Sequence, residues 1–233
     1  MDPRKIYGLE AVPHSQSELL KAVSPWDPAS YTTSELLIPE SEVVTKTLEY
    51  VKMKLAEKTF NHSMRVFYYG SAIAHKHLPS FVPSLETYFL TCLLHDIGTT
   101  EENLNTTRLS FEFYGGYLAL DLLKGFGAPQ DQAESVAEAI IRHQDFGNVG
   151  KISTVGQLIQ LSTVFDNVGI NPTLVSKKTI ESVVNAFPRD GWSSCFATTI
   201  GNELQLKPWA HTSAISGAAD AVENNQLMKP WDK

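Results

Sequence analysis

The sequence predicts an all-α protein, and three observations support this fold class. Apolar residues recur at helical spacing in successive segments, prolines and glycines separate those segments, and no stretch shows the strict alternation typical of a strand. With 233 residues, of which 42% are hydrophobic and 19% charged, the chain can bury a sizeable core. We therefore expect a helical domain at residues 41–233, including a C-terminal tail, preceded by an arm at residues 1–40.

The arm is predicted to be irregular and to wrap the helical body. Prolines interrupt any sustained period, and only residues 17–23 indicate a short turn. Trp26 and Tyr31 are the side chains expected to anchor the arm. The prolines of the arm are Pro3, Pro13, Pro25, Pro28 and Pro39.

Seven helices are predicted after the arm, each from its apolar spacing and its start and stop signals. The third is apolar on nearly all sides, so it should be buried. Residues 101–108 are polar and are expected to form a loop. After Pro188 the chain is expected to form short helices and loops, with tryptophans at positions 192, 209 and 231. The predicted helices span residues 41–55, 59–77, 83–97, 110–125, 131–141, 154–168 and 178–187.

The candidate site centres on His95-Asp96, at the end of the buried helix and just before Gly98. Neighbouring helical side chains diverge by about 100°, and a shared metal ion would be a reason to aim both at one point. His62 and Asp166 lie in two other predicted helices, where an unpaired carboxylate would be costly to bury. Two imidazoles and two carboxylates suit a divalent ion such as zinc or iron(II).

These residues follow the H…HD…D pattern of the HD-domain metalloenzymes, and from about residue 40 onward the chain resembles the fungal cyanamide hydratases. Together the matching motifs are specific for that family. They are Thr59-Phe-Asn-His-Ser-Met-Arg-Val-Phe67, Thr91-Cys-Leu-Leu-His-Asp-Ile-Gly98, Ser110-Phe-Glu-Phe-Tyr-Gly-Gly116, Ala139-Ile-Ile-Arg-His143, Phe165-Asp-Asn-Val-Gly169 and Lys207-Pro-Trp-Ala-His-Thr212.

The resemblance implies an HD helical bundle that hydrates cyanamide to urea, with metal-bound hydroxide attacking the nitrile carbon. It implies one Zn²⁺ per chain, or Fe²⁺ in its place, bound by His62, His95, Asp96 and Asp166. One metal is favoured over two because dinuclear relatives place further histidines between the HD pair and the last Asp, where this chain has only one.

The resemblance also implies two catalytic residues, His143 as a general acid and Thr163 as the group that orients hydroxide or substrate. Thr163 lies three residues before Asp166, so the two share a helix face. Each has an alternative explanation within its own helix: His143 as an imidazole near free carbonyls at a helix end, and Thr163 as a hydroxyl bonded to the preceding turn.

Two other functions remain open from the sequence. An HD-type phosphohydrolase acting on a nucleotide would often carry a Lys after the HD pair, where this chain has Thr99-Thr100. A catalytically silent HD-fold binding module is the other alternative, and the presence of every expected ligand position argues against it. Both are less favoured than the hydratase.

The substrate is expected to be a small neutral nitrile in a tight cavity crowded by aromatic side chains, although most aromatic residues are predicted to belong to the core. His211 is expected to be structural, and His14 to lie on the surface. Cys92, close to His95, is expected to be buried.

Composition limits the partners. A net charge of −7 without a Lys/Arg cluster argues against nucleic acid, and no window is apolar enough to span a membrane. Two cysteines and an N-terminus without an apolar leader predict a cytoplasmic protein. The resemblance implies a homodimer or larger homo-oligomer.

Overall fold

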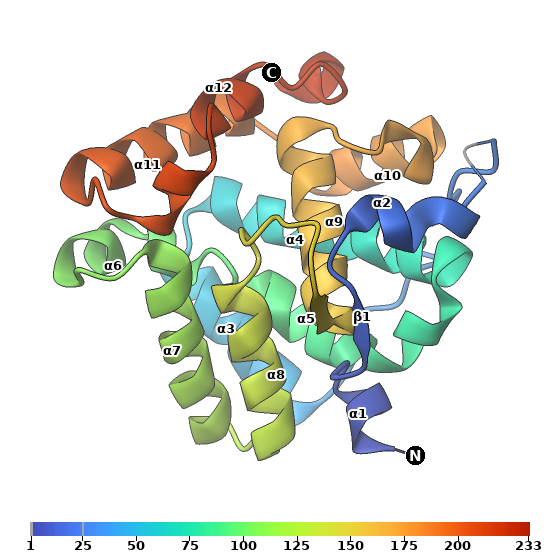
Figure 1. The fold of residues 1–233 in the computed structure, drawn as a ribbon, viewed down its shortest axis with the longest axis horizontal. Coiled ribbons are helices and arrows are strands. Elements are labelled where there is room, and N and C mark those ends of the chain that lie inside the picture. Colours follow the sequence, from blue (N-terminus) through green and yellow to red (C-terminus); the bar gives the residue numbers. More distant parts are fainter. Residues whose placement is uncertain (1, 25) are drawn as a thin grey trace.

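The computed structural model describes residues 2–24 and 26–233, so Pro25 of the predicted arm lies outside the described residues. The described chain is mostly helical, as predicted (Figure 1). None of its helices combines the length and apolar character needed to cross a membrane. The helices are α1 (Pro3–Ile6), α2 (Gln16–Leu19), α3 (Glu42–Lys54), α4 (Glu57–His77), α5 (Leu85–Leu94), α6 (Glu101–Thr106), α7 (Phe111–Gly125), α8 (Gln130–Ile141), α9 (Thr154–Val168), α10 (Lys177–Ala186), α11 (Trp192–Leu206) and α12 (Ala218–Glu223).

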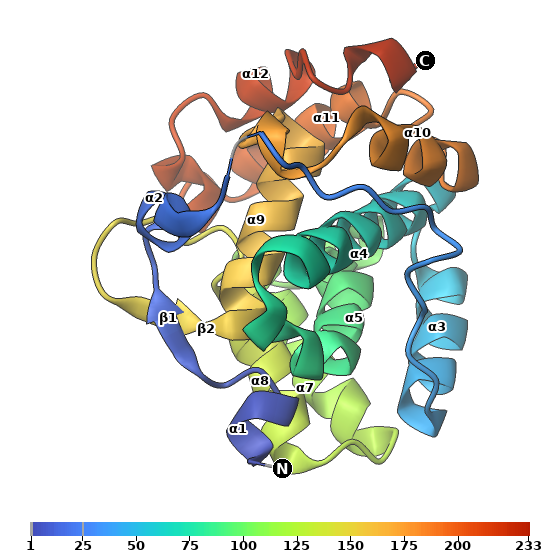
Figure 2. The same ribbon diagram turned by 90° about the vertical axis from the view of Figure 1, so that its right-hand side faces the viewer.

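The core of the molecule surrounds α5, which packs against α3, α4, α8 and α9. Its residues 87–94 are all buried, in agreement with the apolar pattern of the sequence. Helix α9 lies near the centre in Figures 1 and 2 and contacts α4, α5 and α8. Because α4, α5 and α9 carry the candidate site residues, the core itself fixes their relative positions.

Helices α7 and α8 form a closely packed pair in front of α5 (Figure 1). Gly116 of α7 makes the contact possible, because a Cβ atom there would lie 2.5 Å from Cγ1 of Ile141 and 3.0 Å from the carbonyl oxygen of Ala137. Gly116 therefore serves the packing of α7 against α8.

Three elements differ from the sequence prediction. Residues 101–106 form helix α6 rather than a loop, and α11 is a 15-residue helix where shorter helices were expected. A two-stranded antiparallel sheet pairs β1 (Ala11–Pro13) with β2 (Lys151–Ser153), with Val12 opposite Ile152. Strands of three residues are too short to give a recognisable period.

The N-terminal arm runs along the body from α2 towards α3 (Figure 2). Ala29 exchanges backbone hydrogen bonds with residues 174 and 176, and Tyr31 packs against the core. The prediction for Tyr31 is therefore confirmed, but the prediction for Trp26 is wrong, because its side chain is 91% exposed. The division of the chain at residue 40 stays a prediction.

Candidate metal centre

Three buried side chains, those of His62, His95 and Asp96, converge between α4 and the end of α5. The Nε2 atoms of the two histidines are 3.2 Å apart. Oδ2 of Asp96 lies 3.6 Å from Nε2 of His62 and 3.3 Å from Nε2 of His95. The structure thus brings together three of the four ligands that the resemblance implied.

The end of helix α5 explains how His95 and Asp96 reach one point. The helix stops at Leu94, and Asp96 takes φ −100° and ψ 10°, outside the regular helix. The following Gly98 allows a close approach to α7, because a Cβ atom there would lie 2.1 Å from the carbonyl oxygen of Phe111. The helix end and the glycine together place both side chains at the cluster.

The hydrogen bonds of the two imidazoles fix their tautomers. Nδ1 of His95 donates to the carbonyl oxygen of Cys92 at 2.8 Å, and Nδ1 of His62 donates to Oδ2 of Asp166 at 2.7 Å. A neutral imidazole carries one proton, so each Nε2 presents a lone pair to the cluster. This is the arrangement in which a histidine is ready to bind a metal ion.

Asp96 gives the clearest sign that the cluster suits a cation. Both of its carboxylate oxygens are buried, and neither has a hydrogen-bond partner among the described residues. A buried carboxylate without partners is costly, and two imidazole lone pairs beside it add to the repulsion. One divalent cation would satisfy all three groups, and a set of two nitrogens and one carboxylate suits a borderline ion.

The pKa shifts of the clustered side chains also favour a bound cation. Burial alone would raise the pKa of Asp96, but the neighbouring His95 lowers it well below the usual range. Burial lowers the pKa of His62 to about 4, although its bond to Asp166 opposes this. For His95, burial is outweighed by the Asp96 carboxylate, so its pKa is raised. The Asp96 carboxylate is therefore ionised beside a neutral His62.

Asp166 stands on the far side of His62 from the cluster. Its carboxylate accepts hydrogen bonds from Nδ1 of His62, from Nε of Arg65 at 3.1 Å and from Nη1 of Arg189 at 2.6 Å. Burial would raise its pKa, but the two arginines hold it far below the usual range. The arrangement does not match the expected fourth ligand; it favours Asp166 as the group that orients His62.

His143 and Thr163, the two predicted catalytic residues, line the same cavity as His95 and Asp96. The His143 ring meets that of His95 edge to face, with centroids 5.3 Å apart. Its Nδ1 donates to the carbonyl oxygen of Ile140 at 2.6 Å, which leaves a lone pair on Nε2. Burial lowers the pKa of His143 to about 4, so the ring is neutral near pH 7.

Two further polar residues of α9 line the cavity and were not predicted as site residues. Gln160, Thr163 and Asn167 follow one another at helical spacing on one face. Gln160 donates its amide to the carbonyl oxygens of Arg142 and Asp145, which leaves its own oxygen as an acceptor. Gln160 and Asn167 could have been predicted from the sequence, because their spacing places them on the same helix face as Thr163.

The hydrogen bonds of Thr163 and Asn167 settle which of their atoms remain for a ligand. The hydroxyl of Thr163 donates back to the carbonyl oxygen of Ile159 at 2.8 Å, so it keeps its lone pairs. Oδ1 of Asn167 accepts from the indole of Trp192 at 2.7 Å, so its NH₂ group remains as a donor. The α9 face therefore offers both acceptors and a donor.

The cavity has a volume of about 440 Å³ and extends from the metal centre to the surface. Its walls come from α9, from α11 and α12, and from the residues around β1 and β2. Among the described residues that line it, Asp96 is the only acidic one and none is Lys or Arg. The expectation of a tight cavity is wrong, and the aromatics predicted for the core do not line it. Aromatic side chains nevertheless crowd the ligands, since Trp192 stacks on the ring of His62 with centroids 4.4 Å apart.

The arm contributes to one wall through His14, which was expected on the surface. His14 is instead buried, with Nε2 2.5 Å from the carbonyl oxygen of Asp145 and its ring against Gly147. No local pattern predicts this contact, because the two segments are more than 130 residues apart.

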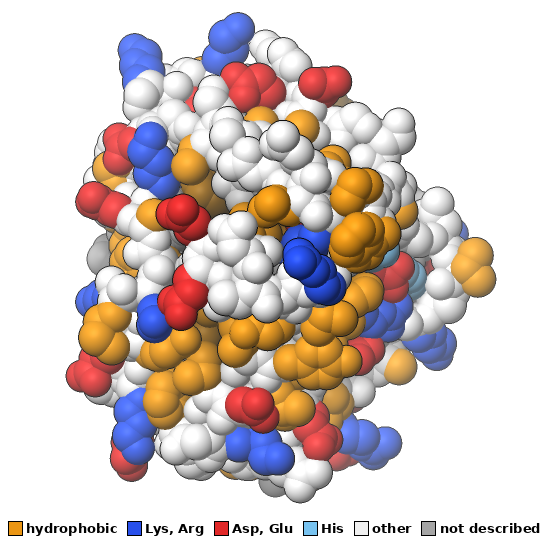
Figure 3. Space-filling view, turned by 90° about the vertical axis from the view of Figure 1, so that its left-hand side faces the viewer, with side chains coloured by type: hydrophobic (Ala, Val, Ile, Leu, Met, Phe, Trp, Pro, Cys, Tyr) orange, Lys and Arg blue, Asp and Glu red, His pale blue; other side chains and the backbone are white. Residues whose placement is uncertain are grey.

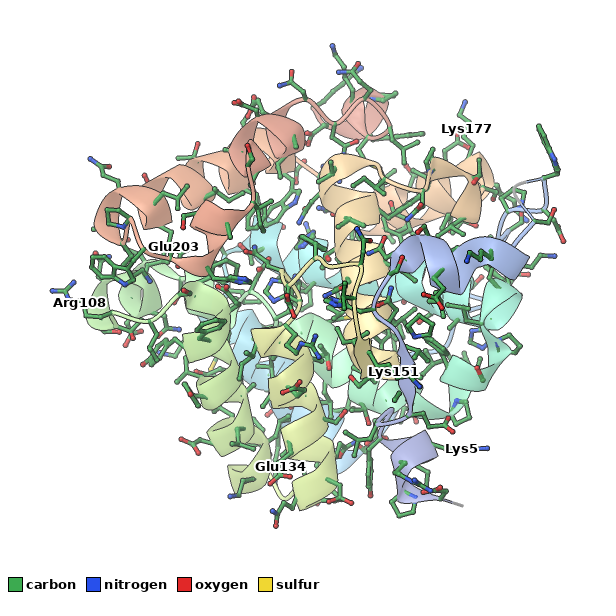
Figure 4. The ribbon with its side chains drawn as sticks, viewed as in Figure 1. Lys5, Arg108, Glu134, Lys151, Lys177 and Glu203 are labelled. Atoms are coloured by element: carbon green, nitrogen blue, oxygen red, sulfur yellow. The ribbon has the colours of Figure 1, made fainter. Side chains whose placement is uncertain are left out.

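The segment after α11 is tied to the start of α7, as expected for a structural role of His211. Nδ1 of His211 lies 2.9 Å from Oε1 of Glu112. Glu203, which points from α11 towards α7 in Figure 4, accepts a hydrogen bond from the backbone of Phe111 at 2.7 Å. Lys207 donates to the carbonyl oxygen of Leu109. These bonds hold the wall formed by α11 and α12 against the bundle.

Comparison with known proteins identifies the family of the chain. The model of the HD domain matches residues 59–167, an interval that contains His62, His95, Asp96 and Asp166. Two proteins of Saccharomyces cerevisiae, cyanamide hydratase DDI2 and cyanamide hydratase DDI3, are each 40% identical to this chain over 210 residues. The match covers 90% of this chain and 92% of each yeast protein. The chain therefore belongs to the cyanamide hydratase family of HD-domain proteins.

Proposed function

We propose that the chain hydrates cyanamide to urea at a single divalent ion, with zinc as the metal. The observation that carries the proposal is the buried, unpartnered carboxylate of Asp96 beside two imidazole lone pairs. The identity to the two yeast hydratases over nearly the whole chain supports the reaction.

His62, His95 and Asp96 would hold the ion. A Zn²⁺ held there would supply Lewis acidity and would lower the pKa of a water molecule to about 7. Asp166 keeps Nδ1 of His62 protonated, so that Nε2 stays available as a ligand, and Arg65 and Arg189 keep Asp166 ionised. Three protein ligands leave a position open for water or substrate.

His143 is neutral in the resting site, so its first task is to accept a proton rather than to donate one. Its free Nε2 takes a proton from the attacking water. The same nitrogen then returns the proton to the nitrile nitrogen, on which negative charge develops. The general-acid role expected from the sequence is thus the second half of a proton transfer.

Thr163 and Asn167 orient the reactants. The lone pairs of the Thr163 hydroxyl accept a hydrogen bond from the attacking water. The NH₂ group of Asn167 donates to the nitrile nitrogen and stabilises its developing charge. Gln160 offers an acceptor to the amino group of cyanamide.

A nucleotide phosphohydrolase is less favoured by the cavity. A phosphate needs cationic partners, and the three arginines nearest the site are already engaged: Arg65 and Arg189 with Asp166, and Arg142 with Asp145. Cyanamide is neutral and needs no such partner.

The decisive experiment is a urea-release assay on purified protein of measured metal content. We expect about one Zn²⁺ per chain, loss of activity with a chelator and recovery on adding zinc. A parallel panel of nucleotides should give no hydrolysis. Zinc-loaded protein that releases no urea would contradict the proposal and favour a silent binding module, whereas phosphate release would favour the phosphohydrolase.

A further inference from the structure

Trp192 is the largest fully buried side chain among the described residues, and the reaction proposed above gives it no task. It is 1% exposed, and it does not line the cavity. A buried indole needs an acceptor for its N–H. The fold supplies one from α9, because Nε1 of Trp192 donates to Oδ1 of Asn167 at 2.7 Å. The acceptor is therefore a side chain that does line the cavity.

A tight turn fixes Trp192 at the first position of α11. Asp190 and Gly191 take left-handed φ values of 49° and 73°, and the backbone N–H of Trp192 donates to the carbonyl oxygen of Arg189 at 2.9 Å. Arg189 is itself paired with Asp166 of α9. In Figures 1 and 2, α11 and the C-terminal end of α9 both lie in the upper part of the molecule. The start of α11 is thus tied to the last turn of α9.

The faces of the indole make contacts that are separate from those of its N–H. The ring of Trp192 lies flat against that of His62, with an angle of 15° between the planes. Phe196 stacks on Trp192 with centroids 5.2 Å apart. These ring contacts need only an aromatic side chain. A Phe at position 192 would keep an aromatic ring there and would remove only the hydrogen-bond donor.

The indole N–H decides which end of the Asn167 amide faces the cavity. An indole nitrogen can only donate a hydrogen bond, whereas an Asn amide carries an acceptor oxygen and a donor NH₂ group. The oxygen of Asn167 must therefore face Trp192. The NH₂ group points in a different direction from the same carbon, and it remains available on the cavity side.

This orientation sets the sign of the dipole that the substrate meets. Negative charge develops on the nitrile nitrogen as water adds, and an NH₂ group stabilises that charge, whereas an oxygen would repel it. Without the indole N–H, Oδ1 of Asn167 would be buried without a donor, which is costly. Turning the amide would relieve this cost by moving the oxygen to the cavity.

We propose that Trp192 is a positioning residue for the hydration: its indole N–H holds the Asn167 amide so that the NH₂ group, and not the oxygen, faces the nitrile nitrogen. The proposal rests on the hydratase function proposed above. Trp192 does not contact the substrate and acts through Asn167.

Trp192→Phe tests the proposal. We expect kcat for cyanamide, per folded and metal-loaded chain, to fall about 10- to 100-fold while KM changes little, because the affected charge develops only in the transition state. Trp209→Phe is the matched control, since its indole also donates one hydrogen bond, to the carbonyl oxygen of Arg108, but is 62% exposed. Its kcat should be unchanged. A wild-type kcat in Trp192→Phe would overturn the proposal.

A double-mutant cycle shows whether Trp192 acts through Asn167. Asn167→Ala removes the donor and should lower kcat about 10²- to 10³-fold. Adding Trp192→Phe should lower it no further, because no amide remains to be oriented. Effects that multiply would identify Trp192 as a purely structural residue. The d–d bands of Co²⁺-substituted Trp192→Phe should match those of the wild type; altered bands would show that the effect passes through His62 instead, against the proposal.

The hydrogen bond can also be measured without catalysis. The chain has four tryptophans, so the indole N–H signal of Trp192 in ¹⁵N-labelled, zinc-loaded protein is assigned by replacing the other three with Phe. In Asn167→Ala this proton signal should move upfield, because its acceptor is lost. In Trp209→Phe it should stay in place. A signal that does not move in Asn167→Ala would contradict the proposed contact, and this measurement does not require Trp192→Phe to fold.

The two proposals fail in different ways. If wild-type protein hydrates cyanamide and Trp192→Phe keeps its kcat, the further inference fails and the proposed function stands. If zinc-loaded wild-type protein releases no urea, the proposed function fails.

Discussion

At the scale of single residues, the centre depends on groups that hold the ligands as much as on the ligands. His62 is usable because Asp166 takes the proton of its Nδ1, and Asp166 is buried as an anion because Arg65 and Arg189 neutralise it. A buried charge of this kind is stable only while all of its partners are present. The three residues and His62 therefore act as a unit.

Asp166→Asn tests this unit. The change removes the charge that offsets two buried arginines, so we expect a loss of about 3–5 kcal/mol in the free energy of unfolding, measured by chemical denaturation. Zinc affinity should fall about 10- to 100-fold, measured by competition with a chromophoric chelator.

The cobalt spectrum distinguishes a supporting role of Asp166 from direct ligation. In Co²⁺-substituted protein, Asp166→Asn should keep the d–d bands of the wild type, because the ligands are unchanged. Asp96→Asn is the matched comparison and should shift them. Bands that shift equally in both variants would identify Asp166 as a ligand.

His143→Ala and Thr163→Val should keep the bound metal and the fold but lose most of the turnover. We expect kcat to fall about 10²- to 10⁴-fold for His143, the usual contribution of a positioned acid–base group. Elemental analysis and thermal unfolding verify that metal and fold persist. Near wild-type kcat in either variant would show that its assigned role is incorrect.

At the scale of the elements, sequence reasoning succeeded where local signals and burial agreed. Helix α9 has the predicted bounds, since Ser153 caps its start and Gly169, with φ +76°, ends it. Helix α6 was missed because most of its residues are polar and it relies on a cap from Thr100. The pairing of Asp166 with Arg189 could not be predicted either, because the two residues are 23 positions apart and only tertiary packing brings them into contact.

Gly98→Ala tests how α5 and α7 position the HD pair. The added methyl would collide with the carbonyl oxygen of Phe111, a backbone atom that cannot move alone. We expect a loss of about 1–3 kcal/mol in the free energy of unfolding, with weaker zinc binding, because Asp96 is only two residues away.

Gly201→Ala is the control for this change. Gly201 lies within α11, and an added Cβ atom there would meet nothing within 4 Å. The free energy of unfolding should increase by about 1 kcal/mol, because Ala favours a helix more than Gly does. If Gly98→Ala did not lower the free energy of unfolding either, the close contact between Gly98 and Phe111 would not position the site.

At the scale of the whole molecule, the arm, the bundle and the C-terminal helices all contribute walls to one cavity. The molecular surface carries further exposed apolar side chains, including Met53, Tyr117 and Trp209. Figure 3 shows hydrophobic side chains gathered in the lower half of one face, interrupted by acidic and basic ones. The expected homo-oligomer stays a prediction, which light scattering would test.

The two buried histidines with lowered pKa values, His62 and His143, make stability decrease at low pH, and His95, whose pKa is raised, opposes them in part. In metal-free protein, His62 and His143 have a pKa of about 4 when folded, against about 6.5 when unfolded. Between these values the unfolded chain binds more protons, so the free energy of unfolding should decrease as the pH falls from about 6.5 to about 4.

Urea denaturation at several pH values would measure this loss. His143→Gln should make the decrease smaller, because it removes one of the two buried rings with a lowered pKa. A stability that stays constant across this pH range would contradict the neutral state of both buried rings.

The ion pair between Arg189 and Asp232, 3.3 Å long, links the metal centre to the far end of the sequence. Asp232 supports Arg189, Arg189 supports Asp166, and Asp166 orients His62. At about 5–20 residues per second, a ribosome needs about 7–27 s to proceed from Asp96 to Asp232. Throughout that interval the nascent chain carries the HD pair without its full support, so we expect stable metal loading to follow the completion of synthesis.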